Sequence, residues 1–417
     1  MNPIQIHYHI RKEVEGSYFT IPFSVPEGME QLSLSYQYPE SGIVDLGLIN
    51  ESGQFLGWSG SARKTIWVAT HSATPGYRMV PIIAGQWQII IGAYKIPITG
   101  LDATYTITFE PRTSRWFKGD LHVHSDASDG QHDIPTLAKA GKKKGLDFIA
   151  VANHNNYSEN LHLPKVSGIT LIPAVEWTHY KGHMNFYGVP APFDNFIANS
   201  EQEMITLVNE AKRKGALVSV CHPCEKNCGY FWGNSDGNRI REELFDLVEV
   251  WNGPMRPTNI QALAWWHELL LKGEKIPLIG GSDYHRVFHP VLLAHPTTHV
   301  YADSPGVEDI LRGIKHGHSY ITNRPGSITL SLSAGEAMMG DTVTWYDGLQ
   351  LSISVNKLKL GMKVKLITAE NEIILPTSNE SVPVINTWKF AYLVIAYQLG
   401  GYDHIVAVSN PIYFDNV

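Results

Sequence analysis

The first part of the chain shows the side-chain period of a β-sheet. Apolar and polar residues alternate from about Ser17 to Phe109, with turn signals such as Pro75-Gly76 and no long stretch of 3.6-residue period. Strands that bury one face alternate in this way because successive side chains point to opposite sides of the sheet. Residues 1–115 are therefore predicted to form an N-terminal β-sandwich.

Beyond Trp116, short apolar runs alternate with stretches of helical period. Strands are predicted at residues 119–123, 148–152, 170–175, 184–189, 217–220, 247–251, 277–280 and 300–302. Helices are predicted at residues 134–144, 201–214, 260–272 and 307–316, each followed by a glycine that favours a helix end. Repeated strand–helix alternation implies a parallel sheet, and about seven or eight such units imply a closed or nearly closed barrel. The alternating pattern returns after Ser327, which predicts a C-terminal β region over residues 327–417.

Composition narrows the class of protein and its partners. The chain has 417 residues, of which 43% are hydrophobic, and a formal net charge of −7, so no basic field exists to attract nucleic acid or anionic lipid. Residues 1–16 lack the apolar stretch of a signal peptide, and the apolar run at residues 391–397 is shorter than the roughly 20 residues of a membrane helix. The absence of a signal peptide and the low count of three cysteines predict a cytoplasmic protein. The lack of a basic field predicts a small-molecule substrate.

Histidine is the compositional anomaly. The chain has 19 histidines, and 15 of them fall between His122 and His318. A strand at residues 119–123 places His122 and His124 on one side, with Asp129 in the loop that follows, so that two imidazoles and a carboxylate can converge on one cation. The spacing alone is weak evidence, because residues 7 and 9 are also histidines and have no carboxylate loop behind them.

Further ligand-type residues stand where predicted strands end. They are His154, Glu176, His222, Asp283 and His285, and His183 opens its own strand as if that strand ran in the opposite direction. Barrel enzymes gather their reactive groups at the carboxyl ends of strands, so these side chains are expected to meet at one rim. Nine ligands of mixed nitrogen and oxygen type exceed the needs of one tetrahedral ion, which predicts two or three divalent ions.

The ordered set of motifs resembles the PHP (polymerase and histidinol phosphatase) metallohydrolases. It comprises HxHSxxSDG, a histidine in an N-H-N context, a strand-end glutamate, GH, HP and GSDxH between about Lys118 and Pro325, and it is most similar to the CehA/McbA-type branch. The resemblance implies a distorted (β/α)7 barrel over residues 116–326, flanked by two β regions. It also implies three metal sites: one held by His122, His124, Glu176 and Asp283, a second by Glu176, His183 and His222, and a third by Asp129, His154 and His285. Asn153 departs from the aspartate that is usual in the family, and this difference bears on the third site.

The resemblance implies a metal-dependent hydrolase that uses Zn, Mn or Fe ions and activates water directly, with Glu176, Asp283 and His222 as its catalytic residues. A phosphoester substrate is favoured because the wider family hydrolyses phosphoesters. A carboxyl ester or carbamate is the alternative, since few Lys or Arg residues lie near the motifs. A hypothesis of a different class is a non-catalytic binding protein whose barrel is degenerate.

Several nearby residues have a structural interpretation beside a functional one. Ordinary thiols are favoured over a further metal site for the three cysteines, and Cys221 is expected to point away from the side of His222; the other two are Cys224 and Cys228. Arg286 is equally consistent with binding a substrate anion and with pairing a carboxylate. Aromatic residues near the motifs are expected in the core rather than in a pocket: Tyr180, Tyr230, Trp232 and Trp251. The remaining histidines are expected to be structural or on the surface, and among them His179 and His289 are the next candidates for a functional role.

Overall fold

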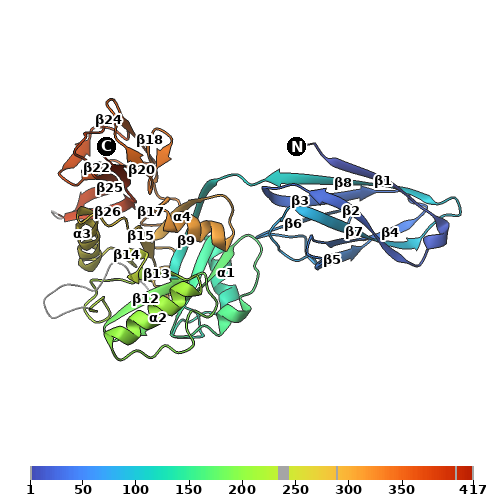
Figure 1. Ribbon diagram of the computed structural model, residues 1–417, viewed down its shortest axis with the longest axis horizontal. Coiled ribbons are helices and arrows are strands. Elements are labelled where there is room, and N and C mark those ends of the chain that lie inside the picture. Colours follow the sequence, from blue (N-terminus) through green and yellow to red (C-terminus); the bar gives the residue numbers. More distant parts are fainter. Residues whose placement is uncertain (1, 233–243, 288–289, 400–401, 416–417) are drawn as a thin grey trace. The chain divides into compact units, whose positions relative to one another are not determined.

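The computed structural model describes residues 2–232, 244–287, 290–399 and 402–415, and the chain forms two compact units. The first comprises residues Met1–Ser114 together with Lys165–Gly168, and the second comprises Arg115–Pro164 and Ile169–Val417. Strands outnumber helices in both units (Figure 1). No helix in the described ranges is both long and apolar enough to span a bilayer.

The first unit consists of two antiparallel four-stranded sheets, in the orders β1-β8-β3-β6 and β2-β7-β4-β5. Their strands are β1 (Ile4–Ile10), β2 (Tyr18–Val25), β3 (Met29–Gln37), β4 (Ile43–Ile49), β5 (Phe55–Gly60), β6 (Thr65–Ala69), β7 (Gly85–Lys95) and β8 (Leu101–Pro111), with a short helix η1 (Lys12–Val14). Alternate residues of both sheets, such as Leu34, Leu46 and Trp87, form one buried cluster. The period of two read along the sequence therefore corresponds to strands with one buried face.

A long mixed sheet runs through the second unit, in the order β15-β14-β13-β12-β11-β10-β9-β16-β17-β26-β25-β22-β23. Its first part contains β9 (Arg115–Val123), β10 (Phe148–His154), β11 (Thr170–His179), β12 (Gly182–Tyr187), β13 (Leu217–Val220), β14 (Leu247–Asn252), β15 (Leu278–Gly281), β16 (Thr297–Ala302) and β17 (Ser319–Thr322). Each strand predicted between residues 119 and 302 overlaps one of these, although the boundaries shift by a few residues.

The four α-helices of the described residues lie close to the predicted ranges. They are α1 (Ile134–Lys143), α2 (Glu201–Arg213), α3 (Pro257–Leu271) and α4 (Val307–Lys315), and a short helix η2 (Glu159–His162) was not predicted. Local signals explain their starts: Asp133 caps α1 by accepting a hydrogen bond from the Thr136 N–H at 2.9 Å, and Ser200 and Glu203 form a capping box on α2. Helix α3 begins three residues earlier than predicted because Pro257 suits the first turn.

The cap on α1 gives a test of this local structure. Asp133→Ala is expected to lower the free energy of unfolding by about 1 kcal/mol, because the Thr136 N–H loses its acceptor at an exposed helix start. Chemical denaturation measured by circular dichroism would detect the loss. Asp133→Asn keeps an acceptor and should unfold close to the parent; equal stability of all three proteins would contradict the capping role.

The distorted (β/α)7 barrel that the family resemblance implied is not shown by the structure. Strand β12 runs antiparallel to both β11 and β13, and β16 runs antiparallel to β9. The reason is local: β11 turns back directly into β12 across residues 180–181, so no crossover helix separates them. The region is a mixed α/β fold rich in strands. The segment that follows β15 lies beside the end of β9, where Tyr284 and Val123 form a parallel β-bridge.

The C-terminal β region continues the same sheet. Strand β17 pairs with β26 (Tyr402–Ser409), which pairs with β25 (Phe390–Leu399), so the sheet crosses the boundary predicted at residues 326 and 327 within one compact unit. The remaining strands are β22 (Met362–Thr368), β23 (Glu372–Leu375), β20 (Thr342–Thr344) and β27 (Ile412–Asp415), and a separate sheet of β18 (Thr329–Ala334), β19 (Ala337–Met338), β21 (Gln350–Asn356) and β24 (Asn379–Pro383).

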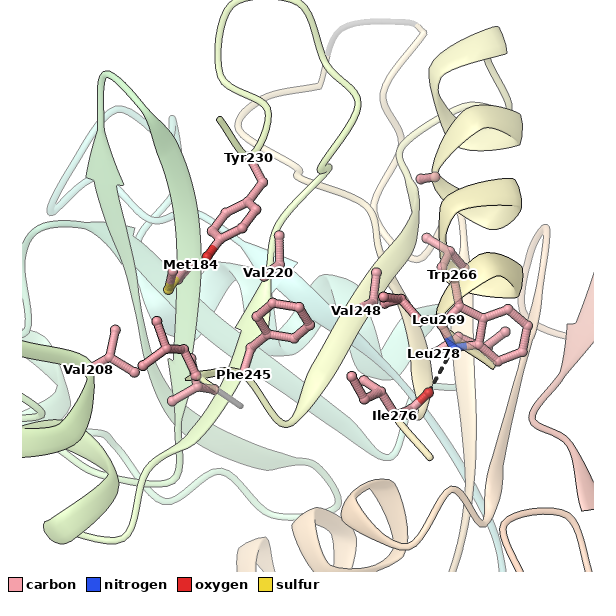
Figure 2. Packing of buried hydrophobic residues seen from close by; sticks show 14 of the residues in the cluster. Met184, Val208, Val220, Tyr230, Phe245, Val248, Trp266, Leu269, Ile276 and Leu278 are labelled. Atoms are coloured by element: carbon pink, nitrogen blue, oxygen red, sulfur yellow. Dashed lines mark hydrogen bonds between the residues drawn. The ribbon is translucent and has the colours of Figure 1, made fainter. Parts of the chain in front are cut away.

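The largest buried cluster supports the strands that carry the ligand-type residues. Helices α2 and α3 contribute Val208 and Leu269, and the strands contribute Val220, Val248 and Leu278 (Figure 2). Trp266 is fully buried, and its indole N–H donates to the carbonyl of Ile276 at 2.7 Å. This packing fixes the carboxyl ends of β13, β14 and β15, where the polar side chains described next begin.

Candidate metal centre

The ligand-type side chains converge at the carboxyl ends of neighbouring strands. His122 lies near the end of β9 and His124 just beyond it, and both are fully buried. His222 follows β13 and Asp283 follows β15, and each has a positive φ, 28° and 55°. Non-glycine residues rarely adopt this backbone region, and such residues concentrate at functional sites. These two turns aim an imidazole and a carboxylate toward the end of β9.

Glu176 is the hub of the cluster. This carboxylate belongs to β11 and is only 1% exposed. Its two oxygens lie 2.8 to 3.4 Å from five imidazole nitrogens, which belong to His122, His124, His154, His183 and His222. His183 reaches it from β12, whose antiparallel direction matches the prediction for the strand that carries this residue. One side chain thus touches five ligand-type residues from four segments.

The side chains form overlapping groups whose ligand atoms lie within 4.8 Å of one another. The groups are His122, His124 and Asp283; Glu176, His183 and His222; His124, Asp129, His154 and His285; and His122, Glu176 and Cys221. The structure therefore brings together all nine residues that the sequence singled out. It differs from the predicted scheme in three respects: the group of His122, His124 and Asp283 does not include Glu176, the group of Asp129, His154 and His285 also includes His124, and His122 and Glu176 form a further group with Cys221.

Buried polar atoms without hydrogen-bond partners test whether this cluster suits metal ions. Within the described residues, His122 Nε2, both ring nitrogens of His124, Glu176 Oε2 and Asp283 Oδ1 are buried and make no hydrogen bond. Leaving such groups unpaired costs free energy, so a cluster of them indicates a missing partner. All five atoms can donate a lone pair to a cation, and imidazole with carboxylate is a donor set that suits transition-metal ions. The residues fit divalent metals.

The chain resembles several known proteins over part of its length. No family model matches the chain. Over 54 residues, 13% of the chain, it is 41% identical to the DNA polymerase/3'-5' exonuclease PolX of Bacillus subtilis, of which the match spans 10%. A protein of Methanocaldococcus jannaschii, MJ1587, is uncharacterized and 26% identical over 161 residues, 35% of the chain and 88% of that protein. A solved two-domain protein from Bacteroides vulgatus is described as containing a predicted PHP-like metal-dependent phosphoesterase. It has 18% identity and a TM-score of 0.41, and the match covers 70% of the chain and 95% of that structure.

A structure described as PHP-like is thus among the proteins that the chain resembles, as the motifs predicted. The narrower likeness to the CehA/McbA branch stays a prediction.

The charges within the cluster around Glu176 influence one another strongly. Burial opposes protonation of His122, but the carboxylates of Glu249, Asp283 and Glu176 outweigh it and hold the pKa of this imidazole well above its usual value. Burial would raise the pKa of Glu176, yet the surrounding imidazoles, His122 first, hold it well below its usual range. Burial dominates at His124 and lowers its pKa to about 4, so this ring is neutral and can act as a ligand at neutral pH.

Glu249 is a site residue that the sequence analysis did not single out. It is buried at β14, and its Oε1 lies 3.0 Å from His122 Nδ1. Its Oε2 accepts hydrogen bonds from the His222 backbone N–H at 3.0 Å and from Asn252 Nδ2 at 3.2 Å. A carboxylate on the far nitrogen of a ligating imidazole fixes its tautomer and orientation. The only sequence signal was a glutamate inside an otherwise apolar run.

Replacement of Glu249 therefore tests a positioning role. Glu249→Gln is expected to weaken metal affinity by roughly 10- to 100-fold while leaving every ligand in place, because His122 loses the charged acceptor that orients it. Metal competition with a chelating dye would measure the change. Because Gln can still accept a hydrogen bond, metal affinity should fall less in Glu249→Asp, which keeps the charge, and more in Glu249→Ala, which keeps neither. Unchanged metal affinity in all three variants would exclude the positioning role.

Asn153, the departure from the family pattern, makes no hydrogen bond to an imidazole among the described residues. Its Oδ1 accepts from the Ser125 N–H at 2.8 Å and from the Ser128 hydroxyl at 3.0 Å, and its Nδ2 donates to Glu159 at 3.2 Å. Ser125 also donates a short hydrogen bond to Glu159. Asn153 thus orders the loop that carries Asp129, and Glu159 supplies a carboxylate beside it.

The expected direction of Cys221 was wrong. Its sulfur belongs to a group with ligand atoms of His122 and Glu176, and His222 also reaches Glu176. The reason is that β13 ends at Val220, and the positive φ of His222 breaks the period of two beyond that point. Cys221 is fully buried, Cys224 and Cys228 are half-buried, and none of the three forms a disulfide within the described residues.

The aromatic residues, Arg286 and His289 also had both a structural and a functional interpretation. Tyr230, Trp232 and Trp251 belong to the buried core, as expected, whereas Tyr180 is 97% exposed. Arg286 is exposed beside His285. His289 lies outside the described residues.

A cavity of about 350 Å³ adjoins the centre at His183 and Asn155. Apolar side chains at its edge are unusually exposed, 97% for Tyr180, 44% for Phe196 and 59% for Ile197. His179 lines the same cavity, and burial lowers the pKa of its imidazole. The lining contains no Lys, Arg, Asp or Glu among the residues that the structure describes. This cavity is the candidate position for part of a substrate.

Proposed function

We propose that the chain is a metal-dependent hydrolase that acts on esters of small molecules, with phosphoesters favoured. The observation that carries the proposal is the set of overlapping ligand groups around Glu176, whose buried nitrogens and oxygens lack hydrogen-bond partners within the described residues. Two or three Zn, Mn or Fe ions are the cofactors that suit this donor set. The narrower CehA/McbA affiliation, the cytoplasmic location and the absence of nucleic-acid partners belong to the same proposal.

Three ions can be assigned to these groups. The first would be held by His122, His124, Glu176 and Asp283, and the second by Glu176, His183 and His222. The third would be held by Asp129, His154 and His285 together with His124. Divalent ions bound there would supply Lewis acidity and lower the pKa of water near the scissile bond. Glu176 would carry the catalytic role of joining two sites, since both of its oxygens contact imidazoles.

Exposure indicates the side from which a substrate enters. The side chain of Asp129 is 53% exposed, and those of Asp283 and His285 are partly exposed. The side chains of His122 and Glu176 are buried. Asp283 and His222 are the other proposed catalytic residues, because Asp283 Oδ1 lies 3.0 Å from His124 Nε2 and His222 Nε2 lies 3.1 Å from Glu176 Oε1. Arg286, exposed next to His285, would meet an anionic group of the substrate.

One paired experiment tests the proposal. Metal content is measured on untreated protein, and hydrolysis of bis(4-nitrophenyl) phosphate is compared with that of 4-nitrophenyl acetate and an aryl carbamate. Bound transition metal with phosphodiester turnover is the expected result. Turnover of the acetate or carbamate alone would replace the favoured substrate by the alternative. A metal-free protein whose His122→Ala and Asp283→Ala variants behave like the parent would instead support a non-catalytic binding protein.

The alternative, a carboxyl ester or carbamate substrate, is favoured by the cavity beside His183. Its lining is aromatic, aliphatic and amide in character, with Asn155 and Asn199 as polar groups and no cation among the described lining residues. Such a lining suits a neutral apolar group better than a second phosphate. The comparison of substrates above therefore also decides whether this cavity or the ligand cluster dominates specificity.

A further inference from the structure

A second cavity, of about 430 Å³, lies at the other end of β9 from the ligand cluster. Its lining includes Trp116 and Lys118 from the start of β9, His299 from β16 and Tyr320 from β17. His299 is the register partner of both Lys118 and Tyr320, so these three residues form one row across adjacent strands. Lys357, which follows β21, contributes a second ammonium group. None of these residues belongs to the proposed metal centre.

Aromatic rings form the inner wall of this cavity. The His299 ring stacks on Tyr320 with centroids 4.4 Å apart and planes at 5°, and both residues are buried. Trp116 contacts Tyr320 edge to face at 4.9 Å and is 36% exposed, so part of its indole is accessible. A planar apolar group has a rigid surface to pack against here.

The hydrogen bonds of His299 show that its Nε2 carries a proton. The Thr322 hydroxyl donates to the carbonyl of Arg324 at 3.0 Å, so it must accept from His299 Nε2–H at 3.0 Å. Burial first, and then the charges of Lys118 and Lys357, lower the pKa of this imidazole to about 3. His299 therefore adds no positive charge, and both ammonium groups lie close enough to influence it.

The positive charge of the two lysines is only partly balanced. In the described part of the chain, no ion pair joins the ammonium of Lys118 or Lys357 to a carboxylate, whereas Lys365 has two such partners. Asp147 also lines the cavity, and its Oδ2 accepts the backbone N–H of Lys118 at 2.9 Å. Two ammonium groups and one carboxylate leave a net charge of +1 in a partly enclosed space. Such a space attracts an anion.

We propose that this cavity is a binding site for a small aromatic anion. The anionic group would lie between Lys118 and Lys357, and the ring would pack against Trp116. The volume is within the usual range for a small-molecule site, roughly 300 to 1,000 Å³. The proposal is independent of the hydrolase activity, because the ligand is bound at the opposite end of β9 and undergoes no reaction.

Isothermal titration with naphthalene-2-sulfonate tests the proposal on the full chain. The probe cannot be hydrolysed as an ester, and 2-naphthol is the matched neutral probe. Lys118→Met and Lys357→Met are each expected to raise the Kd of the sulfonate roughly tenfold, as for loss of one charge-assisted contact. Lys139→Met, which removes an exposed cation on α1, and Asp283→Asn, which alters the metal centre, should both bind like the parent.

Each outcome is decisive. Equal affinity of the parent and both lysine variants would overturn the proposal, as would 2-naphthol binding as tightly as the sulfonate, which would identify a merely apolar crevice. Loss of binding in Asp283→Asn alone would place the probe at the metal centre. Because Lys118→Met could disturb β9, Lys118→Arg serves as the second variant: it keeps the charge and should restore affinity to within about threefold of the parent.

Discussion

Glu176→Gln is expected to abolish hydrolysis and to strip metal from the centre. The substitution keeps the size of the side chain but removes the negative charge that lies against five imidazoles. Removing one partner from a buried charge pair costs about 3–5 kcal/mol, which at 1.4 kcal/mol per tenfold is a loss of roughly two to four powers of ten in metal affinity. Two of the ligand groups contain this residue, so both would weaken together.

The measurement is metal content after gel filtration, followed by turnover at saturating added metal. Glu225→Gln is a suitable control, because Glu225 is a partly buried carboxylate that pairs with Arg256 and Thr258 outside the ligand groups. It should keep both metal and activity. A Glu176→Gln protein that retains its full metal content and turnover would show that this carboxylate is not a ligand and that the centre is organised differently.

The positions of the ligands could be predicted because they depend on strand ends. His154, Glu176 and His222 each follow or end an apolar run that the sequence marks clearly, and parallel neighbours such as β10 and β11 bring their carboxyl ends to one edge. His183 was also predictable, because a ligand at the start of its run requires a strand of opposite direction, which β12 has. These residues are fixed by local pattern together with one general rule of sheet topology.

Other features could not be predicted because they depend on contacts between distant segments. Glu249 touches His122 across 127 positions of sequence, and a single glutamate in a strand gives no sign of that distance. Cys221 turned toward the cluster because the backbone beyond β13 leaves the strand conformation, which periodicity cannot register. The barrel prediction over-extended the same periodicity, since short apolar runs do not reveal how strands pair, and β16 runs antiparallel to β9.

Metal binding is expected to release at least two protons at neutral pH. In the metal-free protein, neighbouring carboxylates outweigh burial and hold the pKa of His122 well above its usual value, and Cys228 and Glu176 do the same for His222. Both imidazoles are then protonated below these raised pKa values, and an ion can bind only after displacing their protons. His124, whose pKa burial lowers to about 4, is already neutral and releases none.

The sign of the pH dependence follows from these directions. As pH falls from the raised pKa values of His122 and His222, protons compete for both nitrogens and metal affinity decreases, by roughly a hundredfold per pH unit for two protons. Titration calorimetry in two buffers of different ionisation enthalpy counts the protons directly. His222→Gln should lower the count by one, whereas His124→Gln should weaken binding with little change in the count. Release of no protons by the parent would mean that the carboxylates do not keep these imidazoles protonated. The ion would then bind to neutral imidazoles, and its affinity would be nearly independent of pH above 6.5.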